Sequence, residues 1–307
     1  GSVSVEIAMK MAAQFWLNSG QDGRTKFLSF KGGYHGDTFA TMMVCDPDEG
    51  MHALFSGVLP AQHIADLPRD EGGEAALNHV LATYGEEIAA ILVEPLVQGA
   101  GGMLFHDEAT LRRLRTLADK HGALLIFDEI FTGFGRTGSF FAMEAAGVTP
   151  DIVTLSKALT GGTAPLSCAM ASTRVCDAFL SDDPGAALMH GPTYMAHALG
   201  CAAANASLDL FEDGAWRARV ANIAQRLEEG LAPCRAFPNV RDVRVKGAIG
   251  VVELETPPDP QEMIARFAVR GCWIKPFGRV VYLTPPFIIR DDELAQLTAA
   301  IVAELAP

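Results

Sequence analysis

A carboxylate and an amine each follow an apolar stretch of the chain. Asp128 ends the stretch 124–128, and Lys157 comes two residues after the stretch 151–155 and just before the glycine turn at 161–162. Lysine is scarce, at seven of 307 residues, and Lys157 is the one placed between an apolar strand and a glycine turn. An amine in apolar surroundings has a lowered pKa and can form a Schiff base with a carbonyl carbon. The simpler interpretation of these two residues alone is a buried Asp–Lys salt bridge.

The carbonyl that Lys157 would attack can belong to a substrate or to pyridoxal 5′-phosphate (PLP). The ring nitrogen of PLP needs a carboxylate beside it to stay protonated. Asp128 lies 29 residues before Lys157. It could supply that carboxylate, because ligands gather at the carboxyl ends of strands in open α/β sheets.

Three other segments suit a flat cofactor that carries a phosphate. The segment 33–36, Gly-Tyr-His-Gly, follows the strand predicted at 26–30 and could lay a ring over a cofactor, although such a segment alone is more often a turn. Gly1-Ser2 precedes the first helix, and Thr193 precedes a helix expected near Ala196. Backbone N–H groups at helix starts bind phosphate. Gly1-Ser2 is also a common cloning remnant, so the residues alone leave its role open.

The elements that must position these groups alternate between strand and helix. Hydrophobic spacing predicts a first helix over 3–17 and further helices at 74–84, 108–121, 216–231, 260–269 and 291–305. Strands are predicted at 26–30, 88–94, 124–128, 151–155, 167–171 and 280–283, and strand character over 243–254 is broken at Gly247 and Gly250. Strands that are apolar on both faces and alternate with helices indicate a mostly parallel sheet covered by helices, the α/β class. We expect this large domain over 1–213 and a smaller α+β domain over 214–307.

Composition and charge exclude several classes of protein. Hydrophobic residues make up 49% of the chain and charged residues 20%, which is enough to bury a core. The net charge of −13 argues against a nucleic-acid partner. No apolar stretch is long enough to span a membrane, and no signal peptide opens the chain. The six cysteines form no Cys-x-x-Cys pair and the histidines lack metal-ligand spacing. We therefore expect a soluble, cytoplasmic protein without a bound metal.

Two long motifs resemble a known family. The stretches 124–138, LLIFDEIFTGFGRTG, and 150–162, PDIVTLSKALTGG, are similar to the signature of class III aminotransferases, which are PLP enzymes of fold type I. The resemblance extends over essentially the whole chain, with supporting stretches that include 33–39, 45–48, 94–102 and 190–195. It is greatest to members that transfer the amino group of S-adenosylmethionine to 8-amino-7-oxononanoate, a step of biotin biosynthesis.

The resemblance implies a role for each matching residue. Lys157 would hold PLP and move the proton, Asp128 would pair with the ring nitrogen, and Tyr34 would lie against the ring and touch the substrate. The remaining implied contacts are cofactor contacts by Gly1, Ser2, Pro192 and Thr193 and substrate contacts by Gly191 and Lys275. Because the family pattern has Thr193 reaching the phosphate of the neighbouring subunit, we expect a homodimer with shared active sites.

Two departures from the family affect these expectations. Family members begin well upstream of Gly1, so we expect the chain to lack an N-terminal stretch that contributes to the small domain and the substrate pocket. Lys275 stands where the family has an arginine for the substrate carboxylate. Lysine offers a point charge in place of a bidentate fork, so carboxylate binding should be weaker, unless Arg279 assists. The alternatives are another class III ω-aminotransferase, acting on ornithine, γ-aminobutyrate or a similar amine, and a catalytically silent protein of the same fold.

Overall fold

The chain forms two compact units. The structure, a computed structural model, describes residues 1–47, 52–55 and 57–307, so Asp48 of the family-like stretch 45–48 lies outside the described residues. Unit 1 comprises 1–134 and 141–210, and unit 2 comprises 135–140 and 211–307. The sequence analysis places 135–140 in the large domain, whereas the structure packs this short segment with unit 2. None of the described helices is long and apolar enough to cross a membrane.

A central sheet organises unit 1. Its strands run in the order β2-β1-β3-β6-β7-β8, and all neighbours are parallel except β7 and β8. The strands are β1 (Lys26–Phe30), β2 (His63–Ala65), β3 (Ile88–Val93), β6 (Leu124–Asp128), β7 (Ile152–Leu155) and β8 (Cys168–Ala171). β3 and β6 are buried along their whole length, as expected for strands covered on both faces. The predicted mostly parallel sheet is confirmed.

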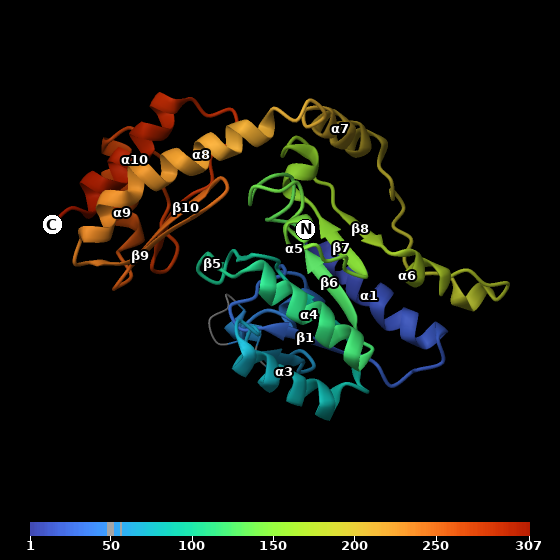
Figure 1. The fold of residues 1–307 in the computed structure, drawn as a ribbon. Coiled ribbons are helices and arrows are strands. Elements are labelled where there is room, and N and C mark those ends of the chain that lie inside the picture. Colours follow the sequence, from blue (N-terminus) through green and yellow to red (C-terminus); the bar gives the residue numbers. More distant parts are fainter. Residues whose placement is uncertain (48–51, 56) are drawn as a thin grey trace. The chain divides into compact units, whose positions relative to one another are not determined.

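Helices cover both faces of this sheet (Figure 1). Helix α1 (Ser2–Asn18) packs one apolar side on β3, β6 and β7, while α4 (Glu108–His121) packs on β3 and β6 from the opposite side. The other helices of unit 1 are α2 (Phe39–Met42), α3 (Glu71–Tyr84), α5 (Ala142–Ala146), α6 (Thr173–Asp177) and α7 (Ala198–Asp209). Short 3₁₀ turns lie at Ala53–Phe55, Lys157–Thr160 and Pro184–Ala186. A small hairpin of β4 (Val97–Gln98) and β5 (Leu104–Phe105) follows β3.

Unit 2 is an antiparallel sheet with helices. Its strands, in the order β11-β10-β9, are β9 (Val240–Lys246), β10 (Ile249–Leu254) and β11 (Val280–Leu283). Its helices are α8 (Trp216–Leu231), α9 (Pro260–Val269) and α10 (Asp291–Leu305), with a 3₁₀ turn at Ala232–Ala236. Gly247 turns the chain between β9 and β10 with φ +54°, and a Cβ there would lie 2.5 Å from the Arg136 carbonyl oxygen. That close approach joins the segment 135–140 to unit 2.

Candidate active site

The sheet brings the predicted chemical groups to one edge. Asp128 ends β6, and its partner across the strand pair is Thr154 of β7, three residues before Lys157. The loop that carries Tyr34 follows β1, and Glu94 follows β3 directly. Because β1, β3, β6 and β7 are parallel neighbours, their carboxyl ends lie together. This is the edge at which open α/β sheets bind ligands.

Asp128 is a buried carboxylate held by a histidine. One of its oxygens, Oδ2, accepts a hydrogen bond from Nδ1 of His35 at 2.8 Å, with both side chains nearly inaccessible to solvent. The other oxygen, Oδ1, accepts from the Ile130 amide at 3.2 Å and from the Thr154 hydroxyl at 3.3 Å. These donors fix the carboxylate group, as an acceptor for a cationic ring nitrogen requires.

Lys157 sits on a strained backbone with no carboxylate bound to it. Its φ is +47°, in the left-handed region that side chains rarely adopt, and strain of this kind often marks functional sites. Although the side chain reaches solvent, protein atoms crowd it and this desolvation lowers the pKa of the amine. Nζ lies 5.1 Å from the centre of the Phe131 ring. Among the described residues no ion pair joins Lys157 to Asp128 or to another carboxylate, so the salt-bridge interpretation is wrong.

Glu94 connects two loops of the site through hydrogen bonds to its carboxylate. Its Oε1 accepts from the Tyr34 amide and its Oε2 from the Gly99 amide, each at 2.9 Å. Burial raises the pKa of this carboxyl to about 7, against the effect of nearby His35 and of the two hydrogen bonds. The sequence analysis gives no role to Glu94 or to the His35–Asp128 pair. Glu94 could have been predicted from its position directly after an apolar strand, because the position of Asp128 at the end of an apolar strand indicated its role in the same way.

The start of helix α1 contacts the Tyr34 loop. The Ser2 hydroxyl accepts a hydrogen bond from the Asp37 amide at 3.2 Å. Gly1 packs against Ile130, two residues after Asp128, since a Cβ on Gly1 would lie 3.1 Å from that side chain. No side chain caps the helix, and in the described part of the chain the Ser2 and Val3 amides have no acceptor. Free amides at a helix start suit a phosphate.

The Gly36→Ala variant should weaken PLP binding by about tenfold or more, because strain and a clash act together. Gly36 has φ +128°, and a Cβ there would lie 2.3 Å from the Ser2 hydroxyl oxygen. Spectrophotometric titration with PLP measures the change. Gly102→Ala is the matched control, since Gly102 has φ +100° and nothing within 4 Å of a Cβ. Equal affinities in the two variants would show that the contact with Ser2 does not matter.

The three predicted residues before α7 form no hydrogen bond with these groups within the described residues of the single chain. Gly191, Pro192 and Thr193 are exposed, and no hydrogen bond within the described residues joins them to Asp128 or Lys157. Thr193 precedes helix α7, whose start lies two residues after the expected position near Ala196. Helix α7 begins at Ala198, and the His197 side chain, not Thr193, accepts from the first-turn amide of Gly200 at 3.2 Å.

Unit 2 holds the predicted carboxylate-binding cation and one that the sequence analysis missed. Lys275 is exposed and, within the described residues, carries no ion pair. Arg279 donates to the Glu255 carbonyl. Arg136 donates to the carbonyls of Ala248 at 3.0 Å and Pro285 at 2.9 Å, and burial lowers its pKa to about 10. It pairs with no carboxylate in the part of the chain that the structure describes, so an anion could neutralise it.

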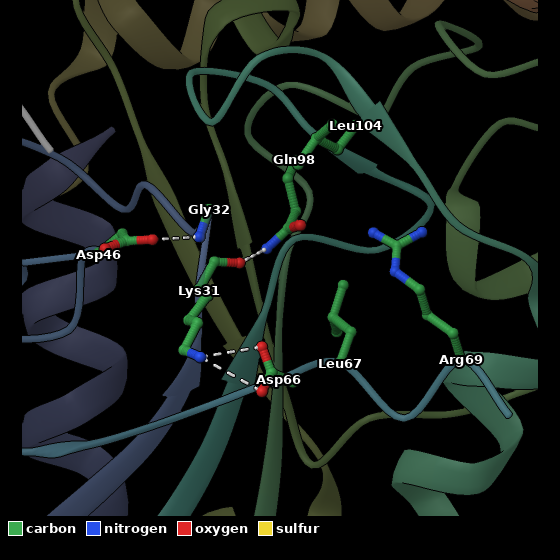
Figure 2. Close-up of a pocket in the computed structure, with 8 residues that line it drawn as sticks. All are labelled: Lys31, Gly32, Asp46, Asp66, Leu67, Arg69, Gln98 and Leu104. Atoms are coloured by element: carbon green, nitrogen blue, oxygen red, sulfur yellow. Dashed lines mark hydrogen bonds and ion pairs between the residues drawn. The ribbon is translucent and has the colours of Figure 1, made fainter. Parts of the chain in front are cut away.

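A cavity of about 480 Å³ opens beside the Tyr34 loop in unit 1 (Figure 2). It is lined by Lys31, Gly32, Asp46, Asp66, Leu67, Arg69, Gln98 and Leu104. Asp46 accepts from the Gly32 amide at 2.6 Å, and Gln98 donates to the Lys31 carbonyl at 2.7 Å. Neither Asp128 nor Lys157 lines this cavity. It therefore adjoins the loop that carries Tyr34 but is separate from Asp128 and Lys157.

Comparison with known proteins identifies the family. The sequence signature of "Aminotransferase class-III" matches residues 1–305. Adenosylmethionine-8-amino-7-oxononanoate aminotransferase of Corynebacterium glutamicum is 46% identical over 99% of this chain and 73% of its own, and that of Mycobacterium leprae is 46% identical over 98% and 70%. The crystal structure of the Methanocaldococcus jannaschii enzyme of the same name superposes with a TM-score of 0.92 at 30% identity, covering 99% of this chain and 73% of that one.

An amine transaminase from an uncultivated Pseudomonas species, in its PLP-bound form, superposes with a TM-score of 0.90 at 33% identity, covering 99% of this chain and 74% of that one. The predicted fold type I architecture is thereby confirmed, since these solved structures share it over nearly the whole chain. The chain belongs to the class III aminotransferase family.

Proposed function

We propose that the chain transfers the amino group of S-adenosylmethionine to 8-amino-7-oxononanoate, the activity in the names of two relatives that are 46% identical to it. The observation that carries the proposal is the arrangement of Asp128 and Lys157. They follow neighbouring parallel strands but do not pair with each other. Asp128 accepts a hydrogen bond from His35, and within the described residues Lys157 forms no ion pair with a carboxylate. A flat ring between a carboxylate and an amine accounts for this arrangement better than structural pairing does.

The residues present fit PLP. Lys157 would hold the aldehyde carbon, Asp128 the ring nitrogen, and the free amides at the start of α1, with Gly1 and Ser2, the phosphate. When bound, PLP supplies an electron-withdrawing ring that lets the proton on an amino-bearing carbon leave. Tyr34 would lie against the ring, on a loop fixed by Glu94 at its amide.

The reaction needs a group that takes up a proton and returns it. Lys157 would do both, and its lowered pKa, which increases the neutral fraction of the amine that accepts a proton, supports this role. Asp128, held by the His35 imidazole, would accept the hydrogen bond from the ring nitrogen. The donor and the keto acceptor would react in turn at the same site.

The donor assay tests the proposal. We expect the full-length protein to transaminate 8-amino-7-oxononanoate with S-adenosylmethionine as donor and to be inactive with ornithine or γ-aminobutyrate. Transfer from those simple amines, with none from S-adenosylmethionine, would make the chain another class III ω-aminotransferase. No transfer from any donor, by protein shown to bind PLP, would support a catalytically silent member.

Lys275→Arg should tighten binding of 8-amino-7-oxononanoate by about tenfold, because a guanidinium grips a carboxylate with two charge-assisted hydrogen bonds. The KM of the keto substrate measures this, with Lys120→Arg, on the exposed surface of α4, as the control. An unchanged or higher KM would mean that another group holds the carboxylate, and the candidate is Arg136, whose guanidinium pairs with no carboxylate among the described residues.

The site is proposed to be completed by a second copy of the chain. Gly191, Pro192 and Thr193 are exposed, which leaves them free to contact a partner, with Thr193 reaching the partner's phosphate site and Gly191 the substrate. Sedimentation of the full-length protein would test this. A monomer that is fully active would contradict it.

A further inference from the structure

The Asp37 carboxylate receives two hydrogen bonds beside the proposed active site. Its Oδ1 accepts from the Tyr34 hydroxyl at 2.9 Å and from Nε2 of His52 at 2.9 Å. The Tyr34 and His52 rings also lie nearly parallel, 19° apart, with their centres 6.0 Å from each other. The three side chains therefore form a closed group, in which the imidazole contacts both the carboxylate and the phenol ring.

His52 is the buried member of this group, and Asp37 is the exposed one. The His52 side chain is only 9% exposed, whereas that of Asp37 is 68% exposed and follows Gly36. An exposed carboxylate loses rotational freedom only where donors hold it. The Asp37 amide is already bound to the Ser2 hydroxyl, so the backbone is set by α1 and the side chain by His52.

We propose that His52 is a positioning residue, which holds the Asp37 carboxylate so that Asp37 in turn fixes the Tyr34 hydroxyl and the tilt of the Tyr34 ring. This inference rests on the proposed function, because it matters for catalysis through the contact of Tyr34 with the cofactor and substrate. His52 itself is proposed to act only through Asp37. In the described part of the chain its Nδ1 has no partner, so the hold on Asp37 is exerted through Nε2.

The electrostatics of the group agree with this order of action. The hydrogen bond from His52, and to a lesser extent that from Tyr34, lowers the pKa of Asp37. The carboxylate therefore remains a hydrogen-bond acceptor. Burial, and to a lesser extent the hydrogen bond to Asp37, raises the pKa of Tyr34 above its usual value. The phenol therefore stays protonated and keeps donating to the carboxylate.

The test compares His52→Gln with His52→Asn in the full-length protein. A glutamine amide nitrogen reaches the position of Nε2 and can replace the donor, whereas an asparagine amide ends near Nδ1 and cannot. His79→Asn, at an exposed position of α3, is the control for the substitution itself.

The first readout is the ionisation of Tyr34, followed by ultraviolet absorbance and isolated by subtracting a Tyr34→Phe variant. The chain has four tyrosines, which makes the subtraction practicable. We expect the pKa of Tyr34, which is raised in the wild type, to fall in His52→Asn but not in His52→Gln. An unchanged Tyr34 titration in His52→Asn, or a rise, would overturn the proposal.

The second readout is kcat/KM with S-adenosylmethionine. We expect His52→Asn to lower it about tenfold, the scale of one hydrogen bond to a charged group, and His52→Gln to restore most of it. In a Tyr34→Phe background, His52→Asn should cost nothing more. If His52→Asn still lowers kcat/KM in the Tyr34→Phe background, His52 does not act through Tyr34, and the proposal is overturned. Should the wild type prove inactive, the proposed function fails, and the titration still decides the role of His52.

Discussion

Replacing Lys157 with alanine is expected to abolish transamination and, with it, the attachment of PLP to the protein by borohydride reduction. The amine is the proposed point of attachment, and it is also the group placed to move the proton. The loss in kcat should reach at least about 10⁴-fold, the upper end of what proton transfer by a positioned group contributes. Single-turnover measurements with S-adenosylmethionine would report the proton-transfer step directly.

The control for this experiment is Lys120→Ala. Lys120 lies on the exposed side of α4, where its ammonium donates to the Asn78 amide oxygen at 2.7 Å. We expect this variant to retain both activity and borohydride fixation. If PLP is still fixed covalently in Lys157→Ala, another lysine is the point of attachment. With seven lysines in the chain, mass spectrometry of the reduced protein would identify it.

Elements with strong periodicity could be predicted from the sequence to the residue. Helices α4, α8, α9 and α10 begin and end where hydrophobic spacing and capping residues place them. Asp107, for example, accepts from the Thr110 amide at 2.8 Å and starts α4. Strands β1, β6 and β11 match in the same way, since each is apolar and bounded by turn residues.

Short elements and strand direction could not be predicted. Strands β2, β4 and β5 have two or three residues each, too few to show any period. Nothing in the stretch 167–171 indicates that β8 runs antiparallel to β7, because direction depends on how the connection folds back. Likewise, the segment 135–140 joins unit 2 through the Arg136 carbonyl, which accepts from the Ala248 amide at 3.0 Å across more than a hundred residues.

The residues of the candidate site also fall into two groups, those recognisable from the sequence and those that only the fold brings together. Asp128 and Lys157 were recognisable because a charged residue after an apolar strand is costly to bury without a function. The partners that make them work are distant in sequence. His35 lies 93 residues before Asp128, and Glu94 lies 60 residues after Tyr34, whose amide it holds. Side chains become neighbours there only because β1, β3 and β6 pair in the sheet.

Asp128→Asn is expected to keep PLP bound while slowing turnover by on the order of 10² to 10³-fold, the range for removal of one preorganised electrostatic partner. The asparagine oxygen can still accept from Nδ1 of His35, so the end of β6 should keep its shape. What is lost is the negative charge that keeps the ring nitrogen protonated. The pH dependence of the bound cofactor's absorbance should therefore shift together with kcat.

Glu129→Gln distinguishes this electrostatic effect from loss of structure. Glu129 is the neighbouring buried carboxylate, and it accepts from the amides of Ala142 at 2.9 Å and Met143 at 2.8 Å. Its replacement should lower the thermal stability of the protein and leave the cofactor's pH dependence unchanged. Equal turnover in Asp128→Asn and wild type would show that Asp128 only anchors His35, because a neutral amide would then serve the ring nitrogen as well as a carboxylate does.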